Sequence, residues 1–329
     1  MLQYDLIRKR ARDITVGCLA ATLLGSTGCG PALGDADTDA DGDRPEAGDG
    51  DGDGDGDGDG DGDAHEPPCA SQYPGMICIP EGPFIMGSTN LDYLEELEMP
   101  EQVVQMSQFH IDRHEVTFGE YRACVNAGVC TPPAAEDPED DRTNGCRWGQ
   151  AGLDDYPVAC IGWLEALIYC EWRGAELPTE AQWEKAGRGT DGRTYSWGNE
   201  EPSCAYASMA TPAEEWGEGN EYGCGTGMAE PVGSHSPAGD SPYGVQDMVG
   251  NVSEFVADWL GPGEAELGAD PLGPQSGPFK VDKGGNFRAT PEHNASIGRL
   301  HLAWRDQGGG PLAGLQAGPA AGFRCAISE

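Results

Sequence analysis

After residue 69 the chain alternates short apolar stretches with turn-forming residues, a pattern that predicts small strands and helices. Apolar residues over Met76–Met86 flank the turn-forming run Pro80–Pro83, which predicts two short strands. Phe109–Asp112 predicts a further strand. These segments indicate a small sheet at the start of a folded domain.

Three helices are predicted from apolar residues at helical spacing and from their caps. Thr117 with Glu120, and Thr179 with Gln182, have the spacing of a capping box, in which each residue hydrogen-bonds the other's backbone. Between them, a helix from Trp163 to Arg173 ends at Gly174. The apolar positions of the three helices are Tyr121, Cys124, Val125, Leu164, Leu167, Ile168, Trp172, Trp183 and Ala186.

Loops make up much of the remainder. Residues 131–157 are rich in Pro and Asp, and the chain after Gly189 is dominated by Gly, Pro, Asn and aromatic residues. The predicted fold class is therefore α+β and loop-rich. A domain of this kind needs covalent braces to be stable.

The first 29 residues have the organisation of an export signal. A basic segment with Arg8, Lys9, Arg10 and Arg12 precedes an apolar run, Ile14–Leu24, that is too short to span a bilayer. The run ends in Ser26–Cys29, which resembles a bacterial lipobox, although Ser26 stands where that pattern prefers Leu. We expect export and lipidation of Cys29, with an ordinary signal peptide as the alternative. Gly30 favours the outer membrane of the cell envelope over the inner one.

Residues 30–68 are predicted to be a disordered tether. Asp and Gly alternate strictly from Asp49 to Asp63, and this run has no apolar residue with which to form a core. A calcium loop would also space carboxylates in this way, but the flanking helices and terminal Glu of such a loop are absent. We therefore expect a spacer that holds residues 69–329 away from the membrane.

The negative charge of the chain argues against one class of binding partner. Of the formal net charge of −38, the tether contributes −14 and residues 69–329 contribute −26, while residues 1–29 carry +2. Such a field repels a phosphate backbone, so we expect no nucleic-acid partner.

Ten cysteines remain in residues 69–329 once Cys18 and Cys29 are set aside, and an even number behind an export signal predicts disulfides. No CxxC pair is present, which argues against a zinc ribbon. The expected pairs are Cys69–Cys78, Cys124–Cys130, Cys146–Cys160, Cys204–Cys224 and Cys170–Cys325. The last would tie the second helix to the end of the chain.

Eight segments in one order resemble the sulfatase-modifying-factor family, whose members carry the formylglycine-generating-enzyme domain. They are Ile79–Ser88, Phe109–Tyr121, Pro157–Trp172, Leu177–Gly187, Tyr195–Asn199, Ser241–Phe255, Lys283–Arg288 and Gly322–Cys325. The resemblance implies a C-type-lectin-like variant of the formylglycine-generating-enzyme fold, with a small twisted sheet, two or three helices and long loops.

The resemblance also implies a chemistry whose ligands are missing from this sequence. Oxidases of the family hold copper(I) between two cysteine thiolates, because a soft ion needs soft ligands. Here no cysteine lies between Cys224 and Cys325, and Ala289 stands where the first thiolate is expected. The second position falls among Asn294–Ile297, and Asn286 replaces the usual Ser. Copper is therefore not expected.

A structural calcium ion is expected instead. The segment Asp247–Glu254 resembles a calcium loop of the family, with carboxylates from Asp247 and Glu254 and main-chain carbonyls from Gly250 and Val252. A second calcium site of the family is not expected, because Tyr206 occupies the place of its Asn ligand.

Two classes of function follow from these observations. The first is a non-catalytic binding or scaffold module of the cell envelope, with a groove for a peptide or glycan. The groove residues would be Asn286, Arg288, His293, Asn294, Arg299, His301 and Arg305. The second is an oxidase acting on a protein cysteine, by relaxed formylglycine-type oxidation or by other metal chemistry. A purely structural envelope protein is a third alternative.

Overall fold

The structure is a computed structural model that describes residues 69–88, 100–135, 145–211, 222–261, 268–289, 300–303, 305–308 and 318–329. The chain divides into two units at Glu66/Pro67, and the described residues all belong to the second. The predicted export signal, Cys29 and the tether lie outside the described residues. Among the described residues, no helix has both the length and the apolar composition needed to cross a membrane.

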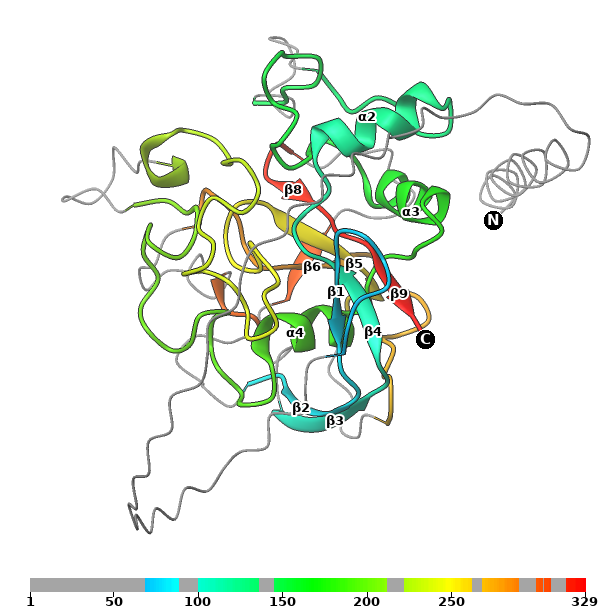
Figure 1. The fold of residues 1–329 in the computed structure, drawn as a ribbon, viewed down its shortest axis with the longest axis vertical. Helices are drawn as coiled ribbons and strands as arrows, with labels where there is room; N and C mark the ends of the chain where they lie inside the picture. The colour runs from blue at the N-terminus through cyan, green and yellow to red at the C-terminus, as the bar shows by residue number, and fades with distance from the viewer. Residues whose placement is uncertain are drawn as a thin grey trace, which may run out of the picture. The chain divides into compact units, whose positions relative to one another are not determined.

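The sheet predicted near the start of the domain is present and is completed by the end of the chain (Figure 1). Strand β1 (Met76–Ile79) pairs antiparallel with β4 (Phe109–Asp112), and β4 pairs on its other edge with β9 (Ala326–Ser328). The sheet order is therefore β1-β4-β9. Strand β2 (Gly82–Met86) pairs separately with β3 (Gln102–Met106), a strand that the sequence pattern did not predict.

The three predicted helices form with the predicted caps. Helix α2 (Phe118–Asn126) starts at the Thr117 capping box, and α4 (Glu180–Arg188) starts at the Thr179 capping box. Helix α3 (Trp163–Trp172) lies between them in the chain. Each cap supplies partners to backbone N–H groups that the first turn leaves unpaired.

A second sheet forms in the region where the sequence predicted mainly loops. Its strands are β5 (Ser253–Trp259), β6 (Lys280–Lys283), β7 (Asp306–Gly308) and β8 (Ala321–Gly322), in the order β7-β6-β5-β8. A short 3₁₀ turn, η2, spans Tyr222–Gly225. These strands are short and pair over long sequence distances, so local periodicity gives little sign of them.

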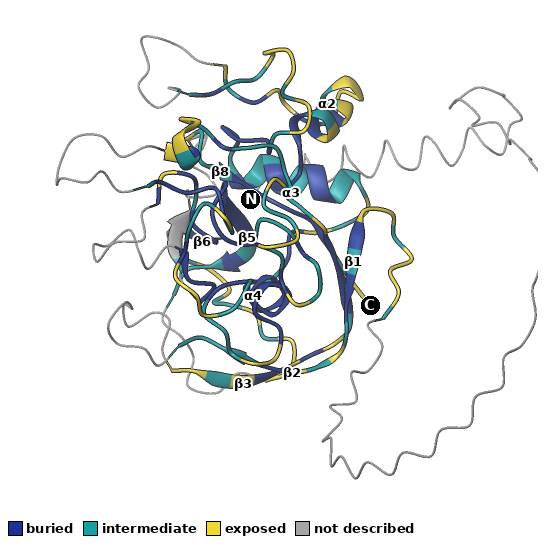
Figure 2. Cartoon of the chain, turned by 60° about the vertical axis from the view of Figure 1, so that its left-hand side comes forward, coloured by how far each residue is buried: buried dark blue, intermediate teal, exposed yellow. Residues whose placement is uncertain are grey.

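Two apolar clusters make up most of the core (Figure 2). One surrounds Trp183 of α4, which is fully buried, and includes Phe109 and Ile111 of β4. The other joins α2 to α3, where the rings of Tyr121 and Tyr169 stack with their centroids 5.4 Å apart. Both clusters receive side chains from the β1-β4-β9 sheet and from β5 or its flanks.

The buried face of α3 differs from the predicted apolar positions. Trp163, Ala166, Tyr169 and Cys170 are the buried residues of this helix. The predicted residues Leu164, Leu167, Ile168 and Trp172 are only partly buried against the same cluster. Because α3 is apolar on nearly all sides, its periodicity does not select one face.

Helix α4 is buried along its whole length, including its charged residues. It packs against β2 and β5, and all nine of its residues are buried. The Lys185 ammonium donates to the carbonyls of Pro80 and Gly82 at 2.6 and 3.0 Å. Burial without such partners would cost several kcal/mol per charge, on the order of the penalties seen for buried ions.

All five expected disulfides are confirmed. The bonds join Cys69–Cys78, Cys124–Cys130, Cys146–Cys160, Cys170–Cys325 and Cys204–Cys224. Four of them close loops of 6 to 20 residues, whereas Cys170–Cys325 spans a sequence separation of 155. This last bond fastens α3 to the residue that precedes β9.

Candidate functional site

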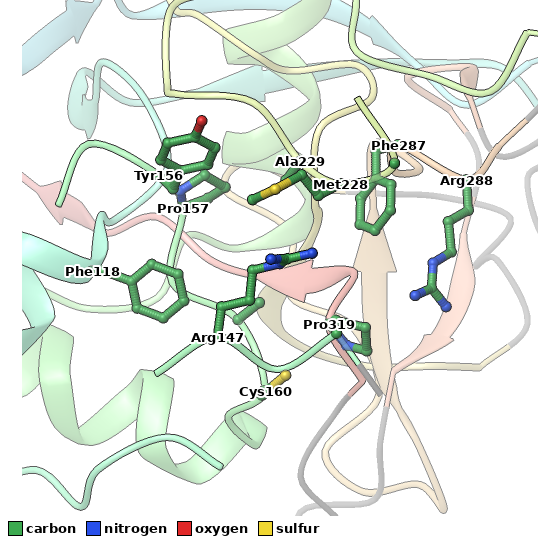
Figure 3. Close-up of a pocket in the computed structure, with 13 residues that line it drawn as sticks. Phe118, Arg147, Tyr156, Pro157, Cys160, Met228, Ala229, Phe287, Arg288 and Pro319 are labelled. Atoms are coloured by element: carbon green, nitrogen blue, oxygen red, sulfur yellow. The ribbon is translucent and has the colours of Figure 1, made fainter. Parts of the chain in front are cut away.

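A pocket lies where three loops of the domain meet (Figure 3). One loop runs from Gly145 to Cys160, one includes Gly227–Ala229, and one follows β6. The cavity volume is about 40 Å³, which is room for a few water molecules or one small group. Its lining consists of Phe118, Gly145, Arg147, Tyr156, Pro157, Ala159, Cys160, Gly227, Met228, Ala229, Phe287, Arg288 and Pro319.

Arg147 is held at the pocket by a covalent brace. It follows Cys146, whose disulfide partner Cys160 itself lines the pocket. Its backbone also forms a bridge to Ala135. The side chain is half-buried, and its guanidinium points toward Phe287 and Met228 (Figure 3).

Arg288 reaches the pocket from the loop that follows β6. That loop begins at Gly284, where a Cβ would lie 3.0 Å from the Met248 carbonyl and 3.1 Å from the Trp183 ring. The φ of +87° at Gly284 also favours glycine, so the turn needs this residue. The loop continues to the buried Phe287 and the exposed Arg288.

Aromatic rings hold the Arg288 guanidinium in place. Its central carbon lies 5.1 Å from the centre of the Phe287 ring and 5.9 Å from that of Tyr222. A Cβ on Gly145 would lie 3.7 Å from Nη2 of Arg288. The guanidinium therefore adjoins the turn that carries Arg147, and the two cations share one pocket.

A buried ion pair anchors the acidic turn at Asp247–Glu254. The Arg324 guanidinium donates from Nε and Nη2 to the two Glu254 carboxylate oxygens, both at 2.6 Å. The Trp183 indole adds a third donor to Glu254 at 2.9 Å. A bidentate pair of this kind is strong and geometrically specific.

Two further carboxylates sit beside this ion pair. Asp247 accepts a hydrogen bond from the Gly233 amide at 2.5 Å, and Glu115 accepts one from the Asn251 side chain at 3.0 Å. Burial raises the pKa of Glu115 well above its usual value, and the charges of Asp247 and Glu254 add to the effect. Burial likewise raises the pKa of Asp247, although Gly233 and Arg324 oppose it. Three buried carboxylates thus face one arginine.

Comparison with known proteins identifies the domain. Residues 62–329 match the model of the sulfatase-modifying factor enzyme 1-like domain. The chain belongs to this family. The match begins close to the predicted boundary at residue 69 and to the start of the second structural unit at Pro67.

Relatives of this sulfatase-modifying-factor domain include enzymes of two kinds. The formylglycine-generating enzyme of Thermomonospora curvata is 31% identical over 299 residues, covering 77% of this chain and 93% of the relative. The hercynine oxygenase of Mycolicibacterium smegmatis is 29% identical over 247 residues, covering 65% of this chain and 54% of the relative. The family therefore contains more than one activity.

Solved structures confirm the predicted C-type-lectin-like formylglycine-generating-enzyme fold. PvdO from Pseudomonas aeruginosa superposes with a TM-score of 0.57 and 23% identity, covering 77% of this chain and 94% of that protein. Treponema denticola variable protein 1 superposes with a TM-score of 0.56 and 20% identity, covering 77% and 95%. The likeness supports the α+β, loop-rich and disulfide-braced architecture.

The cysteines of the sulfatase-modifying-factor domain all take part in disulfides. Residues 69–329 contain ten cysteines, and these form the five bonds given above. Ala289, at the position where the resemblance implies a thiolate, is buried and packs in the Trp183 cluster. The segment Asn294–Ile297 lies outside the described residues.

The four positions expected to bind calcium lie in and beside one buried turn. Gly250 has a φ of +81°, and a Cβ there would lie 2.4 Å from the Ser208 carbonyl, so only glycine fits. Within the described ranges, no three His, Cys, Asp or Glu side chains are arranged to hold a metal ion. A calcium ion here would therefore have to use the main-chain carbonyls of Gly250 and Val252 beside Asp247 and Glu254.

The expected groove residues separate into three groups. Arg288 lines the pocket, and the Asn286 side chain accepts a hydrogen bond from the Arg288 amide at 3.0 Å. His301 and Arg305 do not line the pocket and make internal contacts instead. His293, Asn294 and Arg299 lie outside the described residues.

His301 and Arg305 are held by partners in the domain. His301 is 5% exposed, and its Nε2 lies 3.3 Å from the Tyr195 hydroxyl. Burial lowers the pKa of His301 to about 4, and the nearby Arg188 contributes to the shift. Arg305 donates to Glu180 and to the Gly261 carbonyl, both at 2.8 Å. Their basic side chains serve internal packing and pairing.

Arg147 lines the pocket but was not selected by sequence reasoning. It lies in the Pro- and Asp-rich stretch 131–157, which was predicted only to be a loop. The available signal was its position directly after Cys146 and its positive charge in an acidic segment. The neighbouring disulfide fixes the backbone from which the Arg147 side chain extends.

Proposed function

We propose that this protein is a non-catalytic ligand-binding module of the cell envelope and that its ligand enters the pocket lined by Arg147 and Arg288. The pocket is partly apolar, is lined by two cations and is framed by loops on a braced scaffold. Small-molecule and peptide sites commonly combine these features. The alternatives that the family suggests are oxidases, and the experiment below tests them.

The observation that carries this proposal is the state of the thiols. Copper(I) oxidation of the family type needs two thiolates, and every cysteine of residues 69–329 is held in a disulfide. Ala289 has no group that could bind a metal. The chain has the fold of the family but lacks the thiolate ligands for copper(I). This combination favours a binding function over an oxidase function.

The proposed location follows from the start of the chain. A lipid on Cys29 would anchor the protein in the outer membrane, and residues 30–68 would act as a hydrated spacer. The repelling charges of the Asp–Gly run would keep the spacer extended. The binding domain would then sample ligands some distance from the bilayer surface.

Oxidation of a cysteinyl peptide tests the non-catalytic proposal. The purified full chain, supplied with copper(I), oxygen and reductant, is expected to leave the peptide unchanged, because it has no thiolate pair to hold the ion. Mass spectrometry of the peptide would report any aldehyde. The Thermomonospora curvata formylglycine-generating enzyme, run in parallel, is the positive control.

An aldehyde product from this chain would contradict the proposal and establish the oxidase alternative. A metal content of one copper or iron per chain, accompanied by oxygen uptake with the peptide, would do the same. Retention of peptides or glycans on the immobilised protein without any oxidation would support the binding module.

We also propose that the turn Asp247–Glu254 holds a structural calcium ion. The support is the number of buried carboxylates, since Glu115, Asp247 and Glu254 lie around Arg324, with His235 as a further basic group near Asp247. A divalent cation would balance that charge. After treatment with EDTA, saturating calcium at about 100 times its Kd is expected to add about 2.7 kcal/mol, raising Tm by several degrees.

Magnesium is the control for this measurement, because it prefers a smaller octahedral set of ligands and should shift Tm less. The variant Asp247→Ala should lose the calcium-dependent increase. Equal melting temperatures in EDTA and in calcium would rule the ion out.

A further inference from the structure

The two pocket arginines differ from most arginines of the domain in having no carboxylate partner. Among the described residues, six arginines pair with an acidic side chain: Arg122, Arg173, Arg188, Arg193, Arg305 and Arg324. No such pair is formed by Arg147 or Arg288 within the same part of the chain. In a domain with a formal charge of −26, two cations with no carboxylate partner among the described residues leave an anion-binding position open.

The surroundings of this pair are apolar. Apart from the two arginines, Tyr156 is the only pocket-lining residue with a polar side-chain group. The walls come from Phe118, Phe287 and Met228, with prolines at 157 and 319 (Figure 3). A charged group bound here would sit in a partly dehydrated setting, where hydrogen bonds to guanidinium groups are strengthened.

The backbone beside Arg147 is braced, and the side chain of Arg288 lies against aromatic rings. The disulfide Cys146–Cys160 fixes the turn of Arg147, and the rings of Phe287 and Tyr222 flank Arg288. Less backbone ordering is then needed when a ligand binds. A planar guanidinium also matches a carboxylate with two parallel hydrogen bonds.

The rest of the domain limits how much negative charge the ligand can carry. A polyanion such as a nucleic acid would extend beyond the pocket and meet the negative field of the surface. A single carboxylate is attracted by the two guanidinium groups at contact distance. Repulsion from the acidic surface farther away is weak, because salt screens charges over about 8 Å. A sugar acid would bring several hydroxyl groups to walls that offer few hydrogen-bonding partners.

We infer that the pocket binds the carboxylate of a peptide, with an adjacent aromatic or aliphatic side chain packed against the apolar wall. This inference rests on the proposed binding function and names its ligand class. The carboxylate comes from the C-terminus of the peptide or from an Asp or Glu side chain. Arg147 and Arg288 provide the charge, and Phe118, Met228 and Phe287 provide the apolar contact.

Matched probes separate these features. N-acetyl-phenylalanine presents a C-terminal carboxylate beside a phenyl ring, and its amide lacks only the charge. Acetyl-Phe-Asp-amide presents a side-chain carboxylate, and glucuronic acid represents a sugar acid. Binding to the full chain is measured by ligand-observed NMR titration. We expect the acid to bind at least tenfold more tightly than its amide, and glucuronic acid to bind more weakly than both peptide acids.

The arginine variants test the assignment to the pocket. Arg147→Gln and Arg288→Gln are each expected to weaken binding of the acid about tenfold or more, because each removes a charged hydrogen-bond donor to the carboxylate. The double variant should bind acid and amide alike. Arg113→Gln is the matched control, because Arg113 is exposed and lies outside the pocket. Melting temperatures of the variants should match that of the parent.

The outcomes distinguish this inference from the proposed function. Equal binding of acid and amide, both lost on Arg147→Gln, would overturn the carboxylate assignment and leave a binding pocket. Tighter binding of glucuronic acid than of the peptide acids would replace the peptide with a sugar acid. Binding of no probe, at concentrations up to the solubility of each, would overturn both the inference and the proposed use of this pocket.

Discussion

Replacing Cys170 and Cys325 together by alanine is expected to lower the free energy of unfolding by about 5 kcal/mol. The bond closes a loop with a sequence separation of 155, and the chain entropy that a cross-link removes from the unfolded state grows with loop length. A loss of this size is a large fraction of the stability of an ordinary domain. Denaturant unfolding followed by tryptophan fluorescence would measure it.

The Cys124–Cys130 pair supplies a matched control. Its sequence separation is 6, for which the same reasoning gives a loss of about 2 kcal/mol. Cys124, Cys170 and Cys325 are all fully buried, so the cavities left by alanine are similar. Losses of equal size for the two double variants would show that loop length does not set the contribution of Cys170–Cys325.

The second large effect is expected at Lys283, at the end of β6. Its ammonium is fully buried, 3.2 Å from Glu184 and 3.4 Å from Glu180. Burial opposes the ionisation of Glu184, but Lys283 and Arg188 outweigh it and lower the pKa of this carboxyl. Lys283→Met keeps most of the side-chain volume and removes the charge. We expect a loss of about 3–5 kcal/mol, because the carboxylates stay buried with one cation fewer.

The pH dependence of this loss separates charge from packing. Without Lys283 the pKa of Glu184 should rise, so protonation at acidic pH would relieve part of the penalty. The difference in unfolding free energy between parent and variant should therefore be smaller at pH 5 than at pH 8. Arg193→Met is the control, since Arg193 pairs with the more exposed Asp191 and its loss should cost less than about 1 kcal/mol. A difference for Lys283→Met that does not change with pH would assign the effect to packing alone.

Local signals in the sequence predicted local structure well. The capping boxes at Thr117 and Thr179 are made by residues three apart, and both helices start where these pairs indicate. The β1 and β2 segments around Pro80–Pro83 were also predicted, because turn residues act over a few positions. The cysteine pairs follow mainly from short spacing, which leaves few partners for each.

Features that depend on distant contacts were not predictable in the same way. The charged residues of α4 count as polar in any periodicity, yet Glu184 and Lys185 are buried because partners arrive from β6 and from the loop before β2. His301 looked like a groove residue because it is basic and follows Arg288 in sequence, but Tyr195 holds it in the interior. Only the three-dimensional arrangement shows which polar groups form hydrogen bonds or ion pairs with each other.

At the candidate site, too, one residue could be predicted from the sequence and another could not. Family resemblance directed attention to Arg288, because it lies in the matching Lys283–Arg288 segment. It gave no indication of Arg147, which belongs to a stretch between matching segments. Arg147 and Arg288 come to line one pocket because the Cys146–Cys160 disulfide and the turn at Gly145 bring two parts of the chain together. Loops of this fold vary between relatives, so their contribution to a site has to be read from the structure.

The position of β9 has a consequence for how the protein is made. Strand β4 is the middle strand of its sheet, and one of its two neighbours is the last strand of the chain. During synthesis β4 can pair with β1 early, but its second edge stays open until the residues of β9 have been made. An open edge invites pairing with other chains. Nascent molecules would therefore need protection from one another until β9 has paired with β4 and Cys325 has bonded to Cys170.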